Sequence, residues 1–446
     1  MRTDLRIALL LTRGSDRREG WRVALTAVGA ALATGLCLAA VAIAALRGQY
    51  SIPLAHGLLG QPGQRAGAVL TLLLLLVPVF GFLGQCARVG AVHRDRRLAG
   101  LRLAGAGPAQ VRRIAALEAG LACLVGSAVA TAVSAEVLQR QWQSPSAVVW
   151  AGFAAVALAV PVLGALVSAL ALRRVVTSPL GWVRRVRPDA GRRPGLAVLA
   201  AALVMLLTGI VLAPRGHGGL GTAPVLVFGV VILTGLGAVW AVGASARFTG
   251  RVLAERTGDP AVLIAAERLR DDPWAGARTH AAVLLVTVVG TGFVGVRQVL
   301  LHMFEGHDRD EFATDPAFYT TGIDLTGAAI LVALAIALSA LAVGTAESLA
   351  TRRRGLAAQT AAGVPRAVLG RALILETALP LAPAIALAGV GGLGIGFWYG
   401  QLAGDGFVPV LPLVVPVLVY AACVLAAATS LPLLRRSVHP AELRHV

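Results

Sequence analysis

Apolar residues occur along this chain in long blocks, which short segments rich in arginine, proline and glycine separate. Ten of the blocks have about the twenty residues that a helix needs to cross ~30 Å of hydrocarbon. They lie near residues 21–46, 68–91, 114–135, 147–172, 195–213, 222–246, 281–300, 326–349, 372–399 and 409–434. The pattern predicts an all-α polytopic membrane protein with about ten transmembrane helices.

The composition excludes an ordinary soluble domain. Hydrophobic residues make up 57% of the chain and charged residues only 14%, whereas soluble domains have about 25% charged residues. All 40 basic residues are arginine, and a P-loop needs a lysine to contact the phosphates of ATP. Neither H-E-x-x-H nor G-x-S-x-G occurs, so we expect no ATPase motif, no catalytic residue, no metal site and no cofactor on this chain.

The arginines are distributed unevenly along the chain. Of the 40, 34 lie near the two termini or in alternate segments between the apolar blocks. Cytoplasmic segments of membrane proteins carry such an excess, so this distribution predicts cytoplasmic N- and C-termini. Arginine clusters also attract anionic headgroups, and for residues 173–193 this is the favoured interpretation. We therefore expect membrane lipids, and no nucleic acid, among the partners.

The chain contains an internal repeat, in which one fixed offset aligns two parts of the sequence without a gap. The matching pairs are Arg94 and Arg352, Arg96 and Arg354, Leu98 and Leu356, Gly105 and Gly363, Arg113 and Arg371, Leu117 and Leu375, and Glu118 and Glu376. The same offset carries the first four blocks onto the last four. We therefore expect two parallel four-helix modules, residues 1–174 and 262–446, joined by a basic loop and a two-helix insert at residues 175–261.

One of the repeated segments resembles a known family. Residues 89–128 contain a charged run, the pattern Leu-Arg-x-x-Gly-Ala, a spacer, and then a glutamate at the start of an apolar block. This resembles the signature of FtsX-like ABC transporter permeases, the group that includes the macrolide-exporter type. The second copy, residues 351–376, keeps the charged run, the glycine and the glutamate but has Gln359-Thr360 in place of Leu101-Arg102.

The resemblance implies a permease subunit of the bacterial plasma membrane whose cytoplasmic loops bind a separately encoded ATP-binding subunit. ATP and magnesium would bind to that partner, and two modules in one chain imply two copies of it. The expected work is export or release of a lipid-like amphiphile or an antibiotic, or transmission of motion across the membrane. Similar ten-span permeases of the bacitracin-resistance type carry a large outer domain in the place where this chain has only a short segment between its seventh and eighth blocks.

Two alternatives come from other classes of protein. A secondary transporter is one, because parallel repeats also build those folds. The other is a non-transporting regulator of a cell-wall hydrolase.

The resemblance and the repeat together place the contact with the ATP-binding subunit at residues 88–118 and 347–376. The candidate coupling residues are Arg96, Arg97, Arg102, Gly105, Arg112, Arg113, Glu118, Arg353, Arg354, Gly363, Arg366, Arg371 and Glu376. The two glycines fit turns that need a positive φ.

The two glutamates, Glu118 and Glu376, lie just inside apolar blocks, where a carboxylate is costly. We expect each to anchor its loop, with Arg113 or Arg371 as the candidate partner, whereas the alternative is an interfacial glutamate that reaches water.

Two further segments carry weaker signals. The stretches 5–11 and 263–269 mix apolar and charged residues, which predicts short helices along the inner membrane surface. The outer segment 302–324 is acidic and contains two histidines; a solvated loop is favoured there over a metal site.

Overall fold

The computed structural model describes residues 17–46, 62–86, 100–101, 103–141, 145–171, 193–212, 223–305, 316–403 and 407–437. All regular elements in these segments are helices, which confirms the predicted all-α class. The chain divides into two compact units, Met1–Pro188 and Asp189–Val446.

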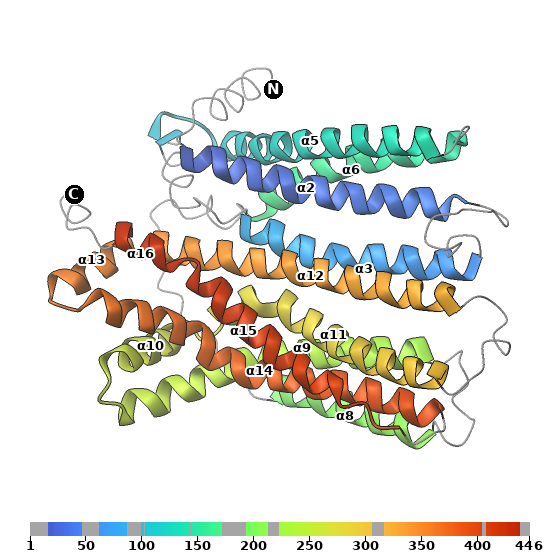
Figure 1. Ribbon diagram of the computed structural model, residues 1–446. Helices are drawn as coiled ribbons and strands as arrows, with labels where there is room; N and C mark the ends of the chain where they lie inside the picture. The colour runs from blue at the N-terminus through green and yellow to red at the C-terminus, as the bar shows by residue number, and fades with distance from the viewer. Residues whose placement is uncertain are drawn as a thin grey trace. The chain divides into compact units, whose positions relative to one another are not determined.

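The described part of the first unit contains four long helices, α2 (Arg17–Ala44), α3 (Pro62–Cys86), α5 (Pro108–Gln141) and α6 (Ala147–Ala171). Helix α5 packs against α2 and α6, and α2 also packs against α3 (Figure 1). Gly126 of α5 permits a close approach to α2, because a Cβ atom there would collide with the backbone oxygen of Ala27. Small residues allow such close packing of membrane helices.

The second unit begins with the hairpin of α8 (Arg193–Leu212) and α9 (Ala223–Arg256), which the short helix α10 (Pro260–Asp271) follows. The remaining elements, in chain order, are α11 (Ala275–Glu305), α12 (Pro316–Thr351), α13 (Arg353–Ala361), α14 (Arg366–Ala403), the 3₁₀ turn Leu411–Leu413, α15 (Val414–Ala428) and α16 (Leu431–Ser437).

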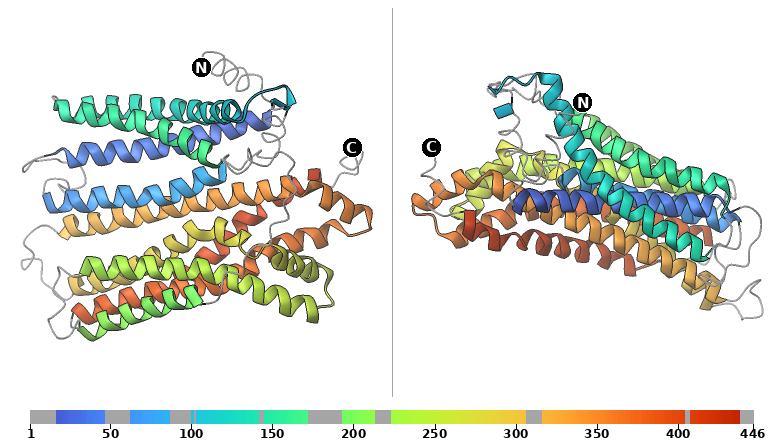
Figure 2. Two further views of the ribbon diagram at one scale, coloured as in Figure 1. Left: turned by 180° about the vertical axis from the view of Figure 1, so that it is seen from behind. Right: turned by 90° about the horizontal axis from the view of Figure 1, so that it is seen from above.

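Helices α9, α11 and α14 form the centre of the second unit. They supply most of its buried apolar cluster, which includes Val242, Leu284 and Leu381, and they lie side by side in Figure 2. At the crossing of α11 and α14, a Cβ atom on Gly295 would lie 2.8 Å from the Cα of Gly396. The two backbones therefore touch, which only glycine permits at this point.

Nine helices of the described segments are long and apolar enough to cross a membrane. They coincide with nine of the ten predicted spans. The other predicted span, residues 195–213, corresponds to α8, a helix of 20 residues that is not among the nine. The apolar blocks of the sequence thus form the helices that they predict.

The sequence repeat is also present in the helix arrangement. Helices α2 and α11 begin at Arg17 and Ala275, and α5 and α14 begin at Pro108 and Arg366, so both pairs of starting residues have the offset that relates Gly105 to Gly363. In each unit, the first and third helices of the repeat make the most extensive helix–helix contact. The two-helix insert, α8 and α9, packs with the second unit.

Helices α9 and α14 are among those of the second unit that are longer than a membrane requires. Helix α9 has 34 residues and α14 has 38, or about 51 and 57 Å at 1.5 Å per residue, against ~30 Å of hydrocarbon. The end of α9 and the start of α14 both pack against α10. Figure 1 shows these three segments, with α13, at one end of the unit. The arginines predict that this end is cytoplasmic.

Candidate coupling site

A tight turn joins α13 to α14 in the second unit. The N–H of Val364 donates to the C=O of Gln359 at 3.0 Å, and the N–H of Gly363 donates to the C=O of Thr360 at 3.0 Å. This is the hydrogen-bond pattern of a Schellman motif, which needs a left-handed residue directly after the helix. Gly363 meets that need with a φ of 93°, and α14 begins three residues later.

The first unit has the same turn before α5. The N–H of Ala106 donates to the C=O of Leu101 at 3.0 Å, and these two positions are the repeat equivalents of Val364 and Gln359. Gly105 has a φ of 94°. The prediction that both glycines form turns with positive φ is therefore confirmed.

Each turn rests on an apolar base. In the first unit, Leu101 and Ala106 pack against Val111 and Ala115. In the second unit, Val364 packs against a larger buried cluster, whose members are Leu349, Leu356, Leu369, Leu373 and Leu434. The apolar side chain at each turn, Ala106 or Val364, thus packs against the helix that follows. A displacement of either turn would therefore displace that helix.

The tip of each turn is exposed. Leu103 is 92% exposed, and Ala361, which occupies the equivalent position in the second unit, is also exposed. Each turn thus carries an exposed apolar side chain at its tip.

Glu376 is the centre of an ion-pair network in the second unit. Arg268 of α10 donates to Oε1 of Glu376 at 2.8 Å, and Arg352, which directly precedes α13, donates to Oε2 at 3.1 Å. Arg268 also donates to the side-chain oxygen of Gln359 at 3.4 Å. Because the side chains of Glu376 and Arg268 are only 13% and 19% exposed, neither charge is well solvated without the other. The network therefore holds α10, α13 and α14 together.

A second link joins α10 to α14. The side chain of Asp259 accepts a hydrogen bond from the N–H of Ala261 at 2.8 Å, which caps α10, and its other oxygen accepts one from Arg371 at 3.0 Å. The N–H of Ala261 holds the pKa of Asp259 below its ordinary value, and the nearby guanidinium of Arg371 acts in the same direction. Helix α10 is thus attached to α14 at two points.

The structure corrects one predicted pairing. Glu376 binds Arg268 and Arg352, whereas Arg371 binds Asp259, so the pairing of Glu376 with Arg371 is wrong. Residues five positions apart lie about 140° apart around a helix, and their side chains therefore meet different neighbours.

The other candidates of the second unit lie around the same turn. Arg353 and Arg354 form the first turn of α13, and Arg366 is the first residue of α14. Arg354 and Arg366 are exposed, whereas Arg353 is half-buried.

In the first unit, Arg112 and Arg113 lie in the second turn of α5, and Glu118 lies further along the same helix with an exposure of only 4%. Its place inside the unit disagrees with the alternative of a glutamate that reaches water. The candidates Arg96, Arg97 and Arg102 lie outside the described residues.

Sequence reasoning missed three residues of this site, Asp259, Arg268 and Arg352. A signal existed for the first, because an aspartate directly before a proline is a common start of a helix. Arg352 is one of the matched positions of the repeat, whereas Arg268 carries no such signal, since it lies 108 residues away from Glu376 in the chain.

The structure also bears on the weaker signals. The stretch 263–269 forms part of α10, as predicted, whereas the stretch 5–11 lies outside the described residues. In the acidic outer segment, residues 306–315 lie outside them too, and His302 stacks on Phe407 with ring centroids 4.2 Å apart. Among the described residues, no three His, Cys, Asp or Glu side chains gather as metal ligands would.

Comparison with known proteins finds a family model that matches part of the chain. Residues 67–180 match the family model described as FtsX-like permease C-terminal. This segment contains the Gly105 turn, α5 and α6, while no curated protein matches the chain. Permeases of this family are transport subunits, and they work with an ABC ATP-binding partner. The chain is thus a multi-pass membrane protein and an ABC transporter permease subunit, with its FtsX-like permease domain at residues 67–180.

Proposed function

We propose that this permease couples ATP hydrolysis by separate ATP-binding subunits to movement of its membrane helices. The two turns at Gly105 and Gly363 contact those subunits, one in each module. The helix movement exports or releases an amphiphile, or transmits motion to the outer side of the membrane.

The observation that carries the proposal is the repetition of the turn. Gly105 and Gly363 are equivalent positions of the repeat, their φ angles are 94° and 93°, and a long helix begins directly after each turn. Each turn places an exposed tip on an apolar base. Two equivalent docking points in one chain suit two copies of one partner, which a symmetric ATP-binding dimer supplies.

The ion-pair network supplies a path from the turn into the membrane. A push on α13 reaches Glu376 directly through Arg352 and indirectly through Gln359 and Arg268, and Glu376 belongs to α14 itself. The bonds are charge-assisted and largely buried, so they transmit displacement better than exposed pairs would.

Helix α14 can bend directly above this anchor. Pro380 and Pro383 lie inside the helix and donate no backbone hydrogen bonds, which weakens the helix at this point. Side chains from neighbouring helices bind the carbonyl oxygens here: Ser245 of α9 donates to that of Pro380 at 2.9 Å, and Tyr420 of α15 to that of Ala378 at 3.3 Å. Movement of the inner part of α14 therefore also reaches α9 and α15.

The buried polar residues support a transporter that receives its energy from a separate subunit and not from a proton gradient. In the centre of the second unit they include Thr234, Thr287 and Thr291, whose side chains are not ionisable at physiological pH. His280 is also buried, but it lies at the inner end of its span. A proton-coupled transporter would need an ionisable group nearer mid-membrane.

The test is co-purification of the full chain with an ATP-binding subunit, followed by measurement of the ATPase rate. We expect Arg354→Gln, on exposed α13, to lower the permease-dependent ATPase rate. Arg297→Gln, which removes a charge from the opposite end of the second unit, is the control and should leave it unchanged. Transport by the purified chain alone, driven by an ion gradient, would contradict the proposal.

A further inference from the structure

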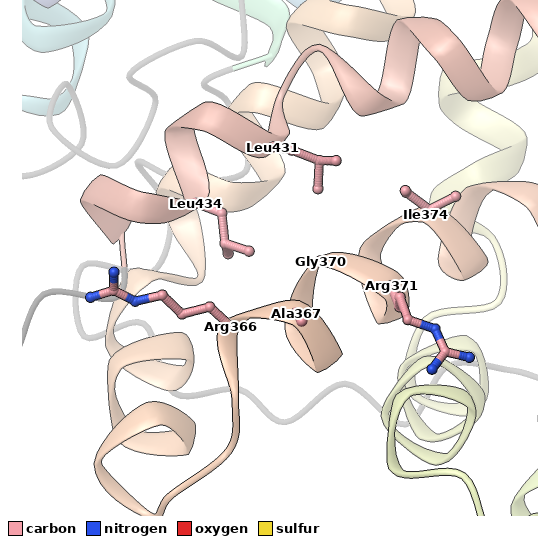
Figure 3. Close-up of a pocket in the computed structure, with 7 residues that line it drawn as sticks. All are labelled: Arg366, Ala367, Gly370, Arg371, Ile374, Leu431 and Leu434. Carbon is pink, nitrogen blue, oxygen red and sulfur yellow. The ribbon is translucent and has the colours of Figure 1, made fainter.

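A groove of about 580 Å³ lies between the start of α14 and α16, and it takes no part in the network around Glu376. Its floor is Ala367 and Gly370, and Ile374, Leu431 and Leu434 form its walls. Figure 3 shows the guanidinium groups of Arg366 and Arg371 at its two ends, each directed away from the apolar middle. The groove is therefore apolar inside and positively charged at its rim.

The groove lies at the predicted inner boundary of the membrane. Leu431 and Leu434 are in the last turn of the apolar span Leu411–Leu434, and two arginines follow at positions 435 and 436. Arginines directly after a span mark the headgroup level on the cytoplasmic side. A molecule in this groove can thus place an apolar part towards the hydrocarbon and a polar part among the arginines.

The charge at the rim is only partly neutralised. Arg366 is exposed and makes no ion pair with the described residues. Arg371 donates one hydrogen bond, to Asp259, and is 64% exposed, so most of its five N–H groups stay available to a ligand. No acidic residue lines the groove.

We propose that this groove binds an anionic phospholipid of the inner leaflet, with its phosphate at Arg366 and an acyl chain between Ile374 and Leu431. Basic pockets between membrane helices on the cytoplasmic side are known to hold such headgroups. A free phosphate ion would leave the apolar walls uncovered, and a neutral lipid would leave the arginines without a counter-charge. The site does not depend on the proposed coupling to ATP, because it needs only the membrane and residues of this chain.

Glycine at position 370 keeps the groove open. A Cβ atom on Gly370 would lie 3.5 Å from a side-chain carbon of Leu431, which is an ordinary contact. A leucine at this position would therefore extend into the groove without a collision with the backbone. Gly370→Leu fills the apolar part, while Arg366→Gln removes the charge, and the two variants test separate halves of the site.

The experiment measures which lipids stay bound to the full chain after purification from nanodiscs of phosphatidylcholine mixed with phosphatidylglycerol, by native mass spectrometry. We expect the wild-type chain to retain phosphatidylglycerol preferentially. Arg366→Gln should lower its retention about fivefold, since an arginine near an anionic surface contributes ~1 kcal/mol, and Gly370→Leu should lower the retention of both lipids at this site. Arg251→Gln, an exposed arginine of α9 outside the groove, is the matched control and should change nothing.

Equal retention of the two lipids by the wild-type chain would overturn the proposal. So would an equal loss in Arg366→Gln and Arg251→Gln, because that result would assign the preference to net charge alone. If the variants bind lipid normally but lose the ATP-binding subunit, the groove belongs to the protein contact and not to a lipid.

Discussion

Gly105 and Gly363 adopt the same left-handed conformation, with φ angles of 94° and 93°, although they belong to different units of the chain. Steric crowding does not require glycine at either position, because a Cβ atom there would meet no neighbouring atom within 4 Å. The backbone conformation alone requires glycine here. The two turns are therefore built in the same way for a reason other than packing, and the proposed contact with an ATP-binding subunit would explain it.

Replacement of Gly363 by alanine should distort the turn. An L-residue in the left-handed region costs about 1–2 kcal/mol, so we expect a lower thermal midpoint and a weaker response of the ATPase rate to the permease. Gly355→Ala is the control, because this glycine of α13 has no neighbour within 4 Å and lacks a positive φ. Equal effects of the two substitutions would show that the turn conformation does not matter.

Replacement of Glu376 by glutamine should destabilise the second unit by about 2–4 kcal/mol, because it leaves Arg268 largely buried without its counter-charge. Glu267→Gln removes an exposed pair with Arg270 on the same short helix and should cost less than about 0.5 kcal/mol. Thermal unfolding of the purified chain measures both. In the Glu376→Gln background, a further Arg268→Gln change should be less harmful than in the wild type; additive losses would argue against the network.

The link between Asp259 and Arg371 should depend on pH. Since the pKa of Asp259 lies below its ordinary value of 3.8, the folded state gains stability from the charged carboxylate above that pH and loses it as the pH falls further. The difference in thermal midpoint between the wild type and Asp259→Asn should thus be present at pH 7 and shrink below pH 3.8. Asp259→Ala should be more harmful than Asp259→Asn at pH 7, because asparagine still caps α10. The reverse order would contradict the capping role.

In the first unit, Gly126→Ala should disturb the packing of α2 against α5. The added Cβ atom would collide with the backbone of Ala27, so the helices must separate. Gly35→Ala on α2 meets no atom within 4 Å and serves as the control. A limited-proteolysis assay in membranes should show faster cleavage of Gly126→Ala only; equal rates for both variants would mean that the crossing tolerates a wider gap.

The sequence was sufficient for the parts of the fold that follow local rules. Apolar length predicts the spans, and the repeated glycine predicts the positive φ at positions 105 and 363. The sequence did not predict the contact of Glu376 with Arg268, because Arg268 belongs to a helix that only the tertiary fold brings near. The predicted pairing of Glu376 with Arg371 is wrong because helix geometry directs Arg371 towards Asp259. The groove at Gly370 could not be predicted either, since its second wall, α16, begins far along the chain, at Leu431.

The central claim is that both turns contact an ATP-binding subunit, and site-specific photocross-linking tests it most directly. A photoreactive residue is placed at Leu103 or Ala361, the equivalent exposed tips of the two units, and at Val417, an exposed position on the span formed by α15 that serves as control. We predict that both tips cross-link to the ATP-binding subunit that co-purifies with the chain and that Val417 does not. Absence of cross-links from both tips, in a complex that still hydrolyses ATP, would contradict the account.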